Sequence, residues 1–114
     1  MKFELFSRSL VKPLLLAAVL APAALAADVK ENWSTHCMAC HGKDGKGQTK
    51  AGRMAGVKDQ SDATYQASLT DEKMLTSIKE GVKDGGKEKM KPFKDKLSDD
   101  EIKALIAQVR SFKK

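Results

Sequence analysis

The fold of this chain is decided by one short stretch, Cys37-Met38-Ala39-Cys40-His41. Residues three and four positions apart lie on the same face of a helical turn, so the two cysteines and His41 can all contact one planar ligand. A disulfide between Cys37 and Cys40 would close a very small loop, and a disulfide stabilises less when the loop that it closes is short. The stretch therefore predicts a bound group rather than a disulfide bridge.

The pattern Cys-x-x-Cys-His is the attachment signature of c-type haem. Thioether bonds from Cys37 and Cys40 to the haem vinyl groups would fix the porphyrin, and the imidazole of His41 would bind its iron. A structural zinc site needs four ligands, and the chain offers only His36 as a further histidine. A thioredoxin-like dithiol would follow a strand, and no such strand is predicted. We therefore expect one covalently attached haem c, with His36 as an exposed bystander.

The iron needs a sixth ligand or an open site, and methionine is the candidate ligand. Met38 lies between the cysteines and cannot reach the other haem face, and Met74 falls on the apolar side of a predicted helix, where core packing explains it. Met54 lies in a glycine-rich loop with much freedom, whereas Met90 precedes Pro92, which stiffens the backbone. Met90 is favoured over Met54, because a metal ligand must be held by a constrained shell of neighbours.

Residues 1–26 have the layout of an export signal. A positively charged start precedes an uncharged apolar run over residues 14–20, and a small-x-small cleavage site follows at residues 24–26. A retained membrane anchor is the alternative, but the uncharged stretch over residues 13–27 is shorter than a bilayer-spanning helix requires. We expect a cleaved secretory signal peptide, a mature domain over residues 27–114 in the periplasm, and no stable membrane span after cleavage.

Cleavage would leave a mature chain of 88 residues with 18 basic and 14 acidic side chains. A domain of this size has a small apolar core of its own. Its aromatic residues are few, namely Trp33, Tyr65, Phe93 and Phe112. A large flat cofactor would supply additional buried apolar surface, which agrees with the haem prediction.

Four helical stretches are predicted from capping residues and apolar spacing. The first runs from about Asp28 toward Cys40, with Asp28 as the N-cap, Glu31 completing a capping box and Gly42 ending the helix. A short second helix is expected around residues 62–68.

The third helix begins after Thr70, and the last one begins after Ser98, which forms a capping box with Glu101. Residues 42–60 and 82–97 are rich in glycine and lysine and are expected to be loops without regular structure. No stretch alternates convincingly enough to predict a strand. The predicted fold class is therefore all-α.

Taken together, these segments make the chain resemble the small bacterial class I cytochromes c over essentially the whole mature sequence. The likeness is carried by residues 37–42 with the preceding helix, and by residues 81–93 with the final helix. It implies a cytochrome c fold in which three to four helices wrap around one covalently bound haem, with the first helix packed across the last. It also implies His41 and Met90 as the axial iron ligands and an exposed haem edge as the electron port.

Two positions depart from the pattern of that family. The loop after the haem motif often holds a proline whose carbonyl accepts a hydrogen bond from the proximal histidine, but residues 51–54 contain none. Which carbonyl orients this histidine is therefore open. The final helix often carries an aromatic residue where this chain has Gln108, so we expect Trp33 to pack against Leu105 and Val109 at the helix crossing.

Iron bound by histidine and methionine suits an electron carrier, because both ligands are neutral and are retained in both oxidation states. We expect an electron-transfer protein rather than an enzyme, soluble and working as a single-electron carrier between periplasmic or membrane-bound redox partners. The alternative is a haem enzyme or ligand sensor, similar to a small peroxidase, with a labile sixth ligand. The sequence offers no distal acid–base pair that would favour this alternative.

Charge is distributed unevenly along the mature chain. Residues 43–58 and 83–96 carry net charges of +4 and +3, whereas residues 59–80 carry −3. The two positive loops belong to the segments expected to flank the haem, so redox partners with acidic docking surfaces are predicted. The alternative is that these lysines only keep the loops soluble. Nucleic acid is not expected as a partner of an exported domain with such mixed charge.

Overall fold

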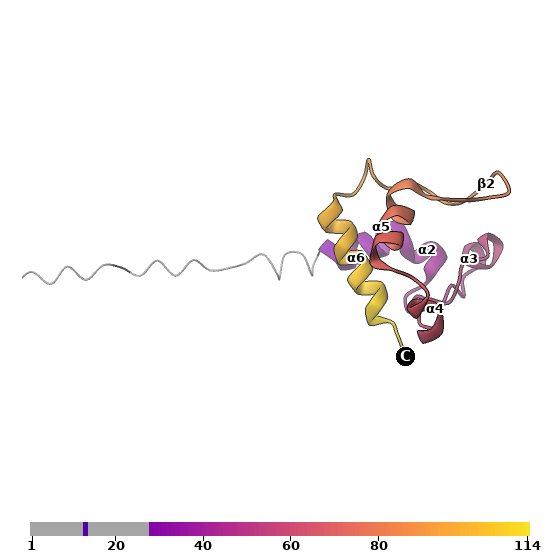
Figure 1. Cartoon of the computed structure of the whole chain (residues 1–114), viewed down its shortest axis with the longest axis horizontal. Coiled ribbons are helices and arrows are strands. Elements are labelled where there is room, and N and C mark those ends of the chain that lie inside the picture. Colours follow the sequence, from indigo (N-terminus) through magenta and orange to yellow (C-terminus); the bar gives the residue numbers. More distant parts are fainter. Residues whose placement is uncertain (1–12, 14–27) are drawn as a thin grey trace, which may run out of the picture.

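The computed structural model describes Pro13 and residues 28–114 (Figure 1), so the predicted signal peptide at residues 1–26 lies, Pro13 apart, outside the described residues. The described part is mostly helical and contains one small sheet. The expected all-α class is therefore confirmed for the helices and wrong for one β-hairpin. Within these residues, no helix combines the length and the apolar character needed to cross a bilayer.

The first helical run begins by residue 28 and continues through η1 (Trp33–Cys37), a segment of π-helix, into α2 (Met38–His41). Short π-helical segments are frequent at functional sites. Gly42 ends the run with φ 79° and ψ 171°, a conformation that glycine adopts far more readily than other residues. The predicted first helix is confirmed, but Asp28 is already helical, so the N-cap predicted at that residue is wrong.

Residues 42–60 are not a continuous loop, because α3 (Lys50–Ala55) lies within them. The N-cap of this helix is Thr49, whose side chain accepts a hydrogen bond from a backbone N–H of the first turn. Its C-cap is Gly56 in the left-handed region, with φ 69°. The high glycine and lysine content misled the prediction, although these two capping residues bracket the helix in the sequence.

Two predicted helices in the middle of the chain are confirmed. Helix α4 (Ala63–Ala67) follows Asp62, and helix α5 (Asp71–Glu80) follows Thr70. Each of these capping side chains accepts a hydrogen bond from a backbone N–H of the first turn. Such caps satisfy donors that the start of a helix leaves unpaired, which is why short polar residues mark both boundaries.

The segment 82–97 contains a β-hairpin where a loop was expected. Strand β1 (Val82–Asp84) pairs antiparallel with β2 (Lys87–Met90) in a two-stranded sheet. Gly85 and Gly86, with φ 56° and 79°, form the turn between the strands. A Gly-Gly pair is a known hairpin signal, but these strands are too short and too charged to show an alternating apolar pattern.

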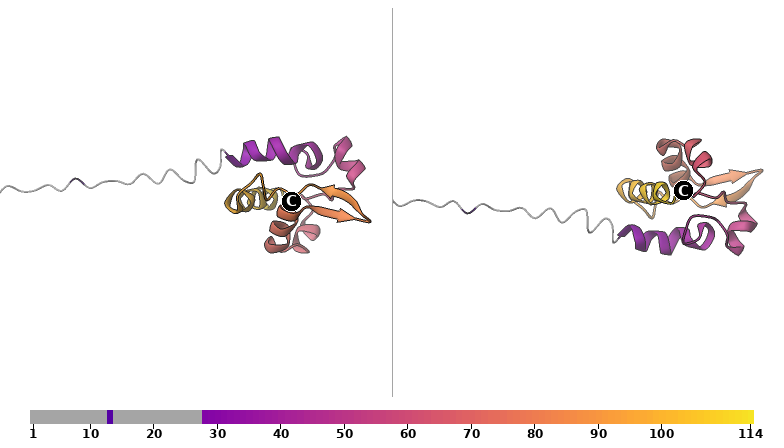
Figure 2. Two further views of the ribbon diagram at one scale, coloured as in Figure 1. Left: turned by 90° about the horizontal axis from the view of Figure 1, so that it is seen from above. Right: turned by 90° about the horizontal axis from the view of Figure 1, so that it is seen from below.

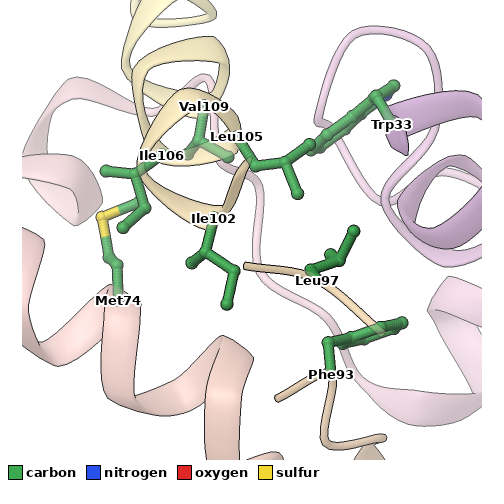
Figure 3. Close-up of a cluster of buried hydrophobic side chains, with 8 residues drawn as sticks. All are labelled: Trp33, Met74, Phe93, Leu97, Ile102, Leu105, Ile106 and Val109. Atoms are coloured by element: carbon green, nitrogen blue, oxygen red, sulfur yellow. The ribbon is translucent and has the colours of Figure 1, made fainter. Parts of the chain in front are cut away.

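Helix α6 (Asp99–Ser111) supplies half of the hydrophobic core. It begins after Ser98 with the predicted capping box, in which the side chains of Ser98 and Glu101 each accept the other residue's backbone N–H. The predicted apolar face of this helix is confirmed, because its core side chains are buried. Figure 3 shows the buried cluster, which consists of Trp33, Met74, Phe93, Leu97, Ile102, Leu105, Ile106 and Val109.

Trp33 joins the first helical run to α6. The Trp33 ring lies 5.1 Å from the ring of Phe112, measured between centroids. Figure 3 shows Trp33 extending toward Leu105, and Val109 belongs to the same buried cluster. The predicted packing of Trp33 toward Leu105 is therefore confirmed, and its contact with Val109 stays a prediction.

The elements are distributed unevenly between the two ends of the domain. In Figures 1 and 2, α3 and the β1–β2 hairpin lie at one end, and α6 lies toward the other. The segment that carries the cysteines lies between α6 and α3 along the domain. Helix α3 and the hairpin, which occupy the two segments predicted to be loops, thus lie at the same end of the domain.

Candidate functional site

Three predicted site residues lie on one helical run. Cys37 is the last residue of η1, and Cys40 and His41 belong to α2. Both cysteines are half-buried free thiols. Their spacing places the thiols and the imidazole within about one turn of helix. The local fold therefore presents the three groups together, as one planar ligand would require.

Burial keeps the Cys37 thiol and the His41 imidazole in their neutral forms. It raises the pKa of the Cys37 thiol to about 11, so the thiol is protonated at neutral pH. It lowers the pKa of His41 from its ordinary value of 6.5, so the imidazole is neutral at pH 7. A neutral imidazole retains the lone pair that a metal ligand needs. A donor set of two thiols and one neutral imidazole fits covalent attachment of a haem and binding of its iron.

Trp33 fixes the turn that follows His41. Its indole N–H donates a buried hydrogen bond to the carbonyl oxygen of Gly42, at 3.1 Å. The ring centroids of Trp33 and His41 are 6.0 Å apart. The Gly47 backbone N–H donates to the carbonyl oxygen of His41 at 2.9 Å. Sequence reasoning assigned Trp33 only to the helix crossing, because a hydrogen bond to a folded turn leaves no sequence pattern.

Helix α3 packs directly against α2. The hydroxyl of Thr49 is shared between the carbonyl oxygens of Ala39 and Cys40, at 2.7 and 3.0 Å. Gly52 makes the approach close, because a side chain there would collide with the carbonyl oxygen of Cys40. The carbonyls at the end of a helix lack intrahelical donors. The Thr49 hydroxyl, at the N-cap of α3, therefore supplies a hydrogen-bond donor to the last carbonyls of α2. Thr49 and Gly52 are supporting residues that the sequence reasoning missed.

The second ring nitrogen of His41, Nδ1, is buried and has no hydrogen-bond partner among the described residues. Metal-binding histidines usually donate this N–H to a carbonyl or a carboxylate. Residues 51–54 hold no proline to supply the carbonyl, and Gly52 contacts Cys40 instead. The carbonyl that would orient His41 therefore stays unassigned. The ring is positioned by its burial and by the hydrogen bonds to the turn behind it.

The methionines differ in exposure. Met74 is a core residue with 7% exposure, as predicted, whereas Met54 on α3 is 76% exposed. Met90, at the end of β2, is half-buried and packs against the same hydrophobic cluster that Cys37 contacts. This arrangement places Met90 and Cys37 on one apolar core. Ligation of iron by Met90 stays a prediction.

The backbone around Met90 is held from two sides. Gly81, with φ 79°, lies so close that a Cβ there would be 2.7 Å from the carbonyl oxygen of Met90. After Pro92, the Phe93 backbone N–H donates to the carbonyl oxygen of Ile78 on α5, at 2.9 Å. The methionine segment therefore depends on α5 for its position.

His36 is half-buried, so the prediction that it is exposed is wrong, whereas the prediction that it takes no part at the iron stays a prediction. Its ring lies edge-on to Phe93, with the ring centroids 5.6 Å apart. Phe93 is three residues beyond Met90, and His36 directly precedes Cys37. The contact thus joins the cysteine segment to the methionine segment.

Comparisons with known proteins identify the family. The sequence model of a family described as cytochrome c oxidase, cbb3-type, subunit III matches residues 24–108. Among solved structures, the KustC0563 c-type cytochrome is 40% identical with a TM-score of 0.65, and the match covers 76% of this chain and 98% of that chain. A point mutant of that cytochrome is 41% identical with a TM-score of 0.67, and the match covers 75% of this chain and 99% of that one. No curated protein matches significantly.

The family match spans most of the chain and includes Cys37, Cys40 and His41. The structural matches cover the solved cytochromes almost completely, so the likeness extends over a whole domain. The donor groups on η1 and α2 are those that such a domain uses. The chain therefore belongs to this family of c-type cytochromes, and its cofactor is covalently bound haem c with iron.

Proposed function

We propose that this chain is a soluble carrier of single electrons, in which Cys37 and Cys40 attach the haem and His41 and Met90 bind its iron. The observation that carries the proposal is the helical run through η1 and α2, which presents two thiols and one neutral, half-buried imidazole. Bound haem c supplies an iron that gains and loses one electron. The chain itself holds and shields that group.

Burial supports Met90 rather than Met54 as the second ligand. Met54 on α3 is 76% exposed. Met90 is half-buried against the core, and contacts with Gly81 and with the Phe93 segment hold its backbone. A thioether and an imidazole are both neutral, so neither ligand needs to change its protonation when the charge of the iron changes. Ligands that stay in place allow fast electron exchange.

Apolar side chains support the carrier function by excluding water. Trp33, Phe93 and Leu97 are each less than 10% exposed, at 6%, 7% and 5%. The cluster that they form contacts both Cys37 and Met90. An apolar surrounding controls solvent access to a metal site and so contributes to its reduction potential.

The partners of the proposed carrier are redox proteins with acidic docking surfaces. This part of the proposal is supported by the net charges of +4 over residues 43–58 and +3 over residues 83–96. Opposite charges steer proteins together at rates that fall as salt rises. Electron exchange that is independent of ionic strength would contradict it.

We also propose that residues 1–26 direct export to the periplasm and are then removed. The proposal is supported by the charged start, the apolar run and the small-x-small site at residues 24–26. The intact mass of the exported protein tests it. The expected mass is that of residues 27–114 plus one haem, and a mass that includes residues 1–26 would contradict cleavage.

The test of the iron ligands compares two methionine variants, Met90→Ala and Met54→Ala. Ferric wild-type protein is expected to show the weak sulfur-to-iron charge-transfer band, and its ferrous form is expected to resist carbon monoxide. Met90→Ala should lose the band and bind carbon monoxide, because it removes the sulfur. Met54→Ala should retain the wild-type spectrum, because its side chain faces solvent.

Two outcomes would overturn parts of the proposal. Loss of the band in Met54→Ala, with the band retained in Met90→Ala, would exchange the ligand assignments. A five-coordinate spectrum in the wild-type protein would instead favour the haem enzyme or ligand sensor, because an open iron can bind a substrate.

A further inference from the structure

One contact between residues that do not bind the haem joins the two sides of the site. The rings of His36 and Phe93 form an edge-to-face pair, with the ring centroids 5.6 Å apart and the ring planes at 67°. Such pairs are attractive, because the positive edge of one ring meets the negative face of the other. His36 directly precedes Cys37, and Phe93 follows Met90 by three residues. The pair therefore links a cysteine that attaches the haem to the segment of the proposed sixth ligand.

The helical run places His36 for this contact. Residues three and four positions apart in a helix lie on the same face. Trp33 is buried in the core, and Cys37 is half-buried. His36 is also half-buried, whereas Ser34 and Thr35 are exposed. The imidazole therefore lies on the inner side of η1, together with the tryptophan and the cysteine.

Phe93 is the fixed point of the methionine segment. Its side chain is 7% exposed and lies in the buried cluster next to Leu97, as Figure 3 shows. Its backbone N–H donates to the carbonyl oxygen of Ile78 at 2.9 Å, and its own carbonyl oxygen accepts from the N–H of Leu97 at 2.9 Å. Only two residues separate Phe93 from Met90, and one of them is Pro92, whose φ is restricted. A shift of Phe93 would therefore move the methionine.

We propose that His36 is a positioning residue, which keeps the sulfur of Met90 on the iron by holding the ring of Phe93. This inference rests on the proposed ligation of iron by Met90 and adds a residue that controls it. His36 needs no contact with the iron for this role. When the ring pair opens, the segment before Phe93 gains freedom, and the sixth position of the iron becomes accessible to an external ligand. The contact thus favours an electron carrier over a haem enzyme or sensor with an open iron.

His36 also lies near a charged group of α6. The Glu101 carboxylate accepts hydrogen bonds from the Ser98 backbone and from the side chain of Asn32, each at 3.0 Å. These bonds are the main reason why the pKa of Glu101 is lowered, and the charge of His36 adds a smaller effect in the same direction. The carboxylate is therefore satisfied without His36, and the ring of Phe93 is its closer partner. An aromatic substitute for His36 separates the two contacts experimentally.

The first experiment compares three variants of the haem-loaded protein. His36→Ala removes the ring, His36→Phe retains an aromatic ring without a charge, and Thr35→Ala is the matched control at an exposed position of η1. The sulfur-to-iron band of the ferric protein and the carbon monoxide affinity of the ferrous protein are measured for each. His36→Ala should weaken the band and bind carbon monoxide about fivefold more tightly, because the edge-to-face pair no longer favours the closed state. His36→Phe and Thr35→Ala should behave like wild type.

Two results of that comparison would overturn the proposal. A band and a carbon monoxide affinity in His36→Ala that match those of Thr35→Ala would show that the ring does not control the sixth position. Equal losses in His36→Phe and His36→Ala would assign the effect to the charge near Glu101 and not to the ring.

Amide hydrogen exchange separates a local role from a general loss of stability. The Phe93 N–H is bonded to the carbonyl oxygen of Ile78, and the Ile102 N–H is bonded to that of Ser98 in the first turn of α6. His36→Ala should speed exchange of the Phe93 amide about fivefold and leave that of Ile102 near its wild-type rate, because segments open locally at different free energies. Equal acceleration of the two amides would mean that His36 only stabilises the fold, which would overturn the proposal.

A double-mutant cycle tests the ring pair itself. Phe93→Leu retains an apolar side chain but removes the ring that His36 contacts. Once that ring is absent, adding His36→Ala should change the carbon monoxide affinity by less than about twofold, because residues in contact have non-additive effects. A full fivefold change in the Phe93→Leu background would show that His36 acts through another residue and would overturn the proposal.

The wild-type protein separates this inference from the proposed function. Ferric wild type without the sulfur-to-iron band would overturn ligation by Met90, and the inference with it. A wild-type band that persists unchanged in His36→Ala would overturn the inference alone and leave the proposed carrier intact.

Discussion

The two sides of the haem site are built differently. The histidine side consists of η1, α2 and α3, and the methionine side consists of β1, β2 and the turn that follows them. On the histidine side, Trp33 and Thr49 donate hydrogen bonds to the carbonyls of Gly42, Ala39 and Cys40. On the methionine side, both strands of the hairpin are largely exposed. The first side is fixed by side-chain hydrogen bonds, and the second by backbone contacts with α5.

This difference separates two tasks. The side that attaches the haem covalently requires a fixed backbone, because two sulfurs and an imidazole must all contact one planar group. Under the proposed ligation, the methionine side supplies only one sulfur, and its segment is anchored at Gly81 and Phe93. Substitutions on the histidine side should therefore affect stability most, whereas those on the methionine side should affect ligation.

The largest effect is expected from Gly52→Ala. The new methyl group would collide with the carbonyl oxygen of Cys40 and lie 2.7 Å from that of Gly47. Overpacking against backbone should lower the free energy of unfolding by about 3 kcal/mol, which exceeds the gain of about 1 kcal/mol from placing alanine in a helix. Thermal unfolding of the haem-loaded protein measures the change.

Gly56→Ala is the matched control for that substitution. A Cβ at Gly56 would meet nothing within 4 Å, but its φ of 69° strains any residue except glycine. The expected loss is therefore only about 1 kcal/mol. If the two variants lost equal stability, the close packing of α3 on α2 would not be what holds the histidine side.

Gly81→Ala should have the next largest effect, on the methionine side. Glycine at this position has φ 79° and ψ 178°, a region that other residues avoid, and a Cβ would lie 2.7 Å from the carbonyl oxygen of Met90. We expect a loss of about 2 kcal/mol, accompanied by weakening of the sulfur-to-iron band at moderate temperature. Spectra recorded during heating measure both.

Gly86→Ala controls for the hairpin. Its φ is also 79°, but a Cβ there would meet nothing within 4 Å. It should cost about 1 kcal/mol and leave the band intact. A band weakened equally by both variants would mean that the hairpin as a whole, and not its contact at Gly81, positions the methionine.

The elements of the domain differ in how well the sequence predicts them, and each side of the haem site contains one that was missed, α3 on the histidine side and the hairpin on the methionine side. Helical periodicity and the caps at Thr70 and Ser98 are local properties of the sequence, so α5 and α6 could be predicted from it. The helical run through η1 and α2, which carries Cys37 and His41, was predicted in the same way. The hairpin was missed because its strands are exposed and charged, which removes the apolar alternation that marks a half-buried strand.

The supporting contacts of the site could not be predicted for a different reason. The bonds from Trp33 to Gly42 and from Thr49 to Cys40 join residues nine positions apart across a turn. Such contacts depend on how the turn folds and not on any periodic spacing. The half-buried position of His36 against Phe93 likewise depends on the tertiary packing of two distant segments.

Trp33→Phe tests the hydrogen bond on the histidine side. Phenylalanine retains an aromatic ring but leaves the buried carbonyl of Gly42 without its donor. The expected loss is about 1.5 kcal/mol. NMR spectra should show a shift of the His41 ring protons, because the turn behind that ring is no longer held.

Phe112→Leu is the corresponding control, because it removes the ring that packs 5.1 Å from Trp33 but retains the indole donor. It should lower stability by about 1 kcal/mol through lost packing, without shifting the His41 resonances. If Phe112→Leu shifted them as strongly, general packing and not the hydrogen bond would position His41.

The smallest effect is expected at Glu101, whose carboxylate links α6 to the first helical run by a hydrogen bond from Asn32. The backbone N–H of Ser98 and the side chain of Asn32 donate hydrogen bonds to its carboxylate, and they lower its pKa from the ordinary value of 4.5. A carboxylate whose pKa is lower in the folded than in the unfolded protein stabilises the fold at pH values above its unfolded pKa. This contribution is lost as the pH falls through the folded pKa.

Glu101→Gln should therefore lower the unfolding temperature slightly at pH 7, and the difference from wild type should shrink as the pH falls below 4.5. Asn32→Ala should raise the pKa of Glu101 toward 4.5 in an NMR titration, because it removes one of the donors at 3.0 Å. A difference that stayed constant down to low pH would show that the glutamate acts by packing and not by charge. The contribution of the Glu101–Asn32 hydrogen bond to stability would then be insensitive to pH.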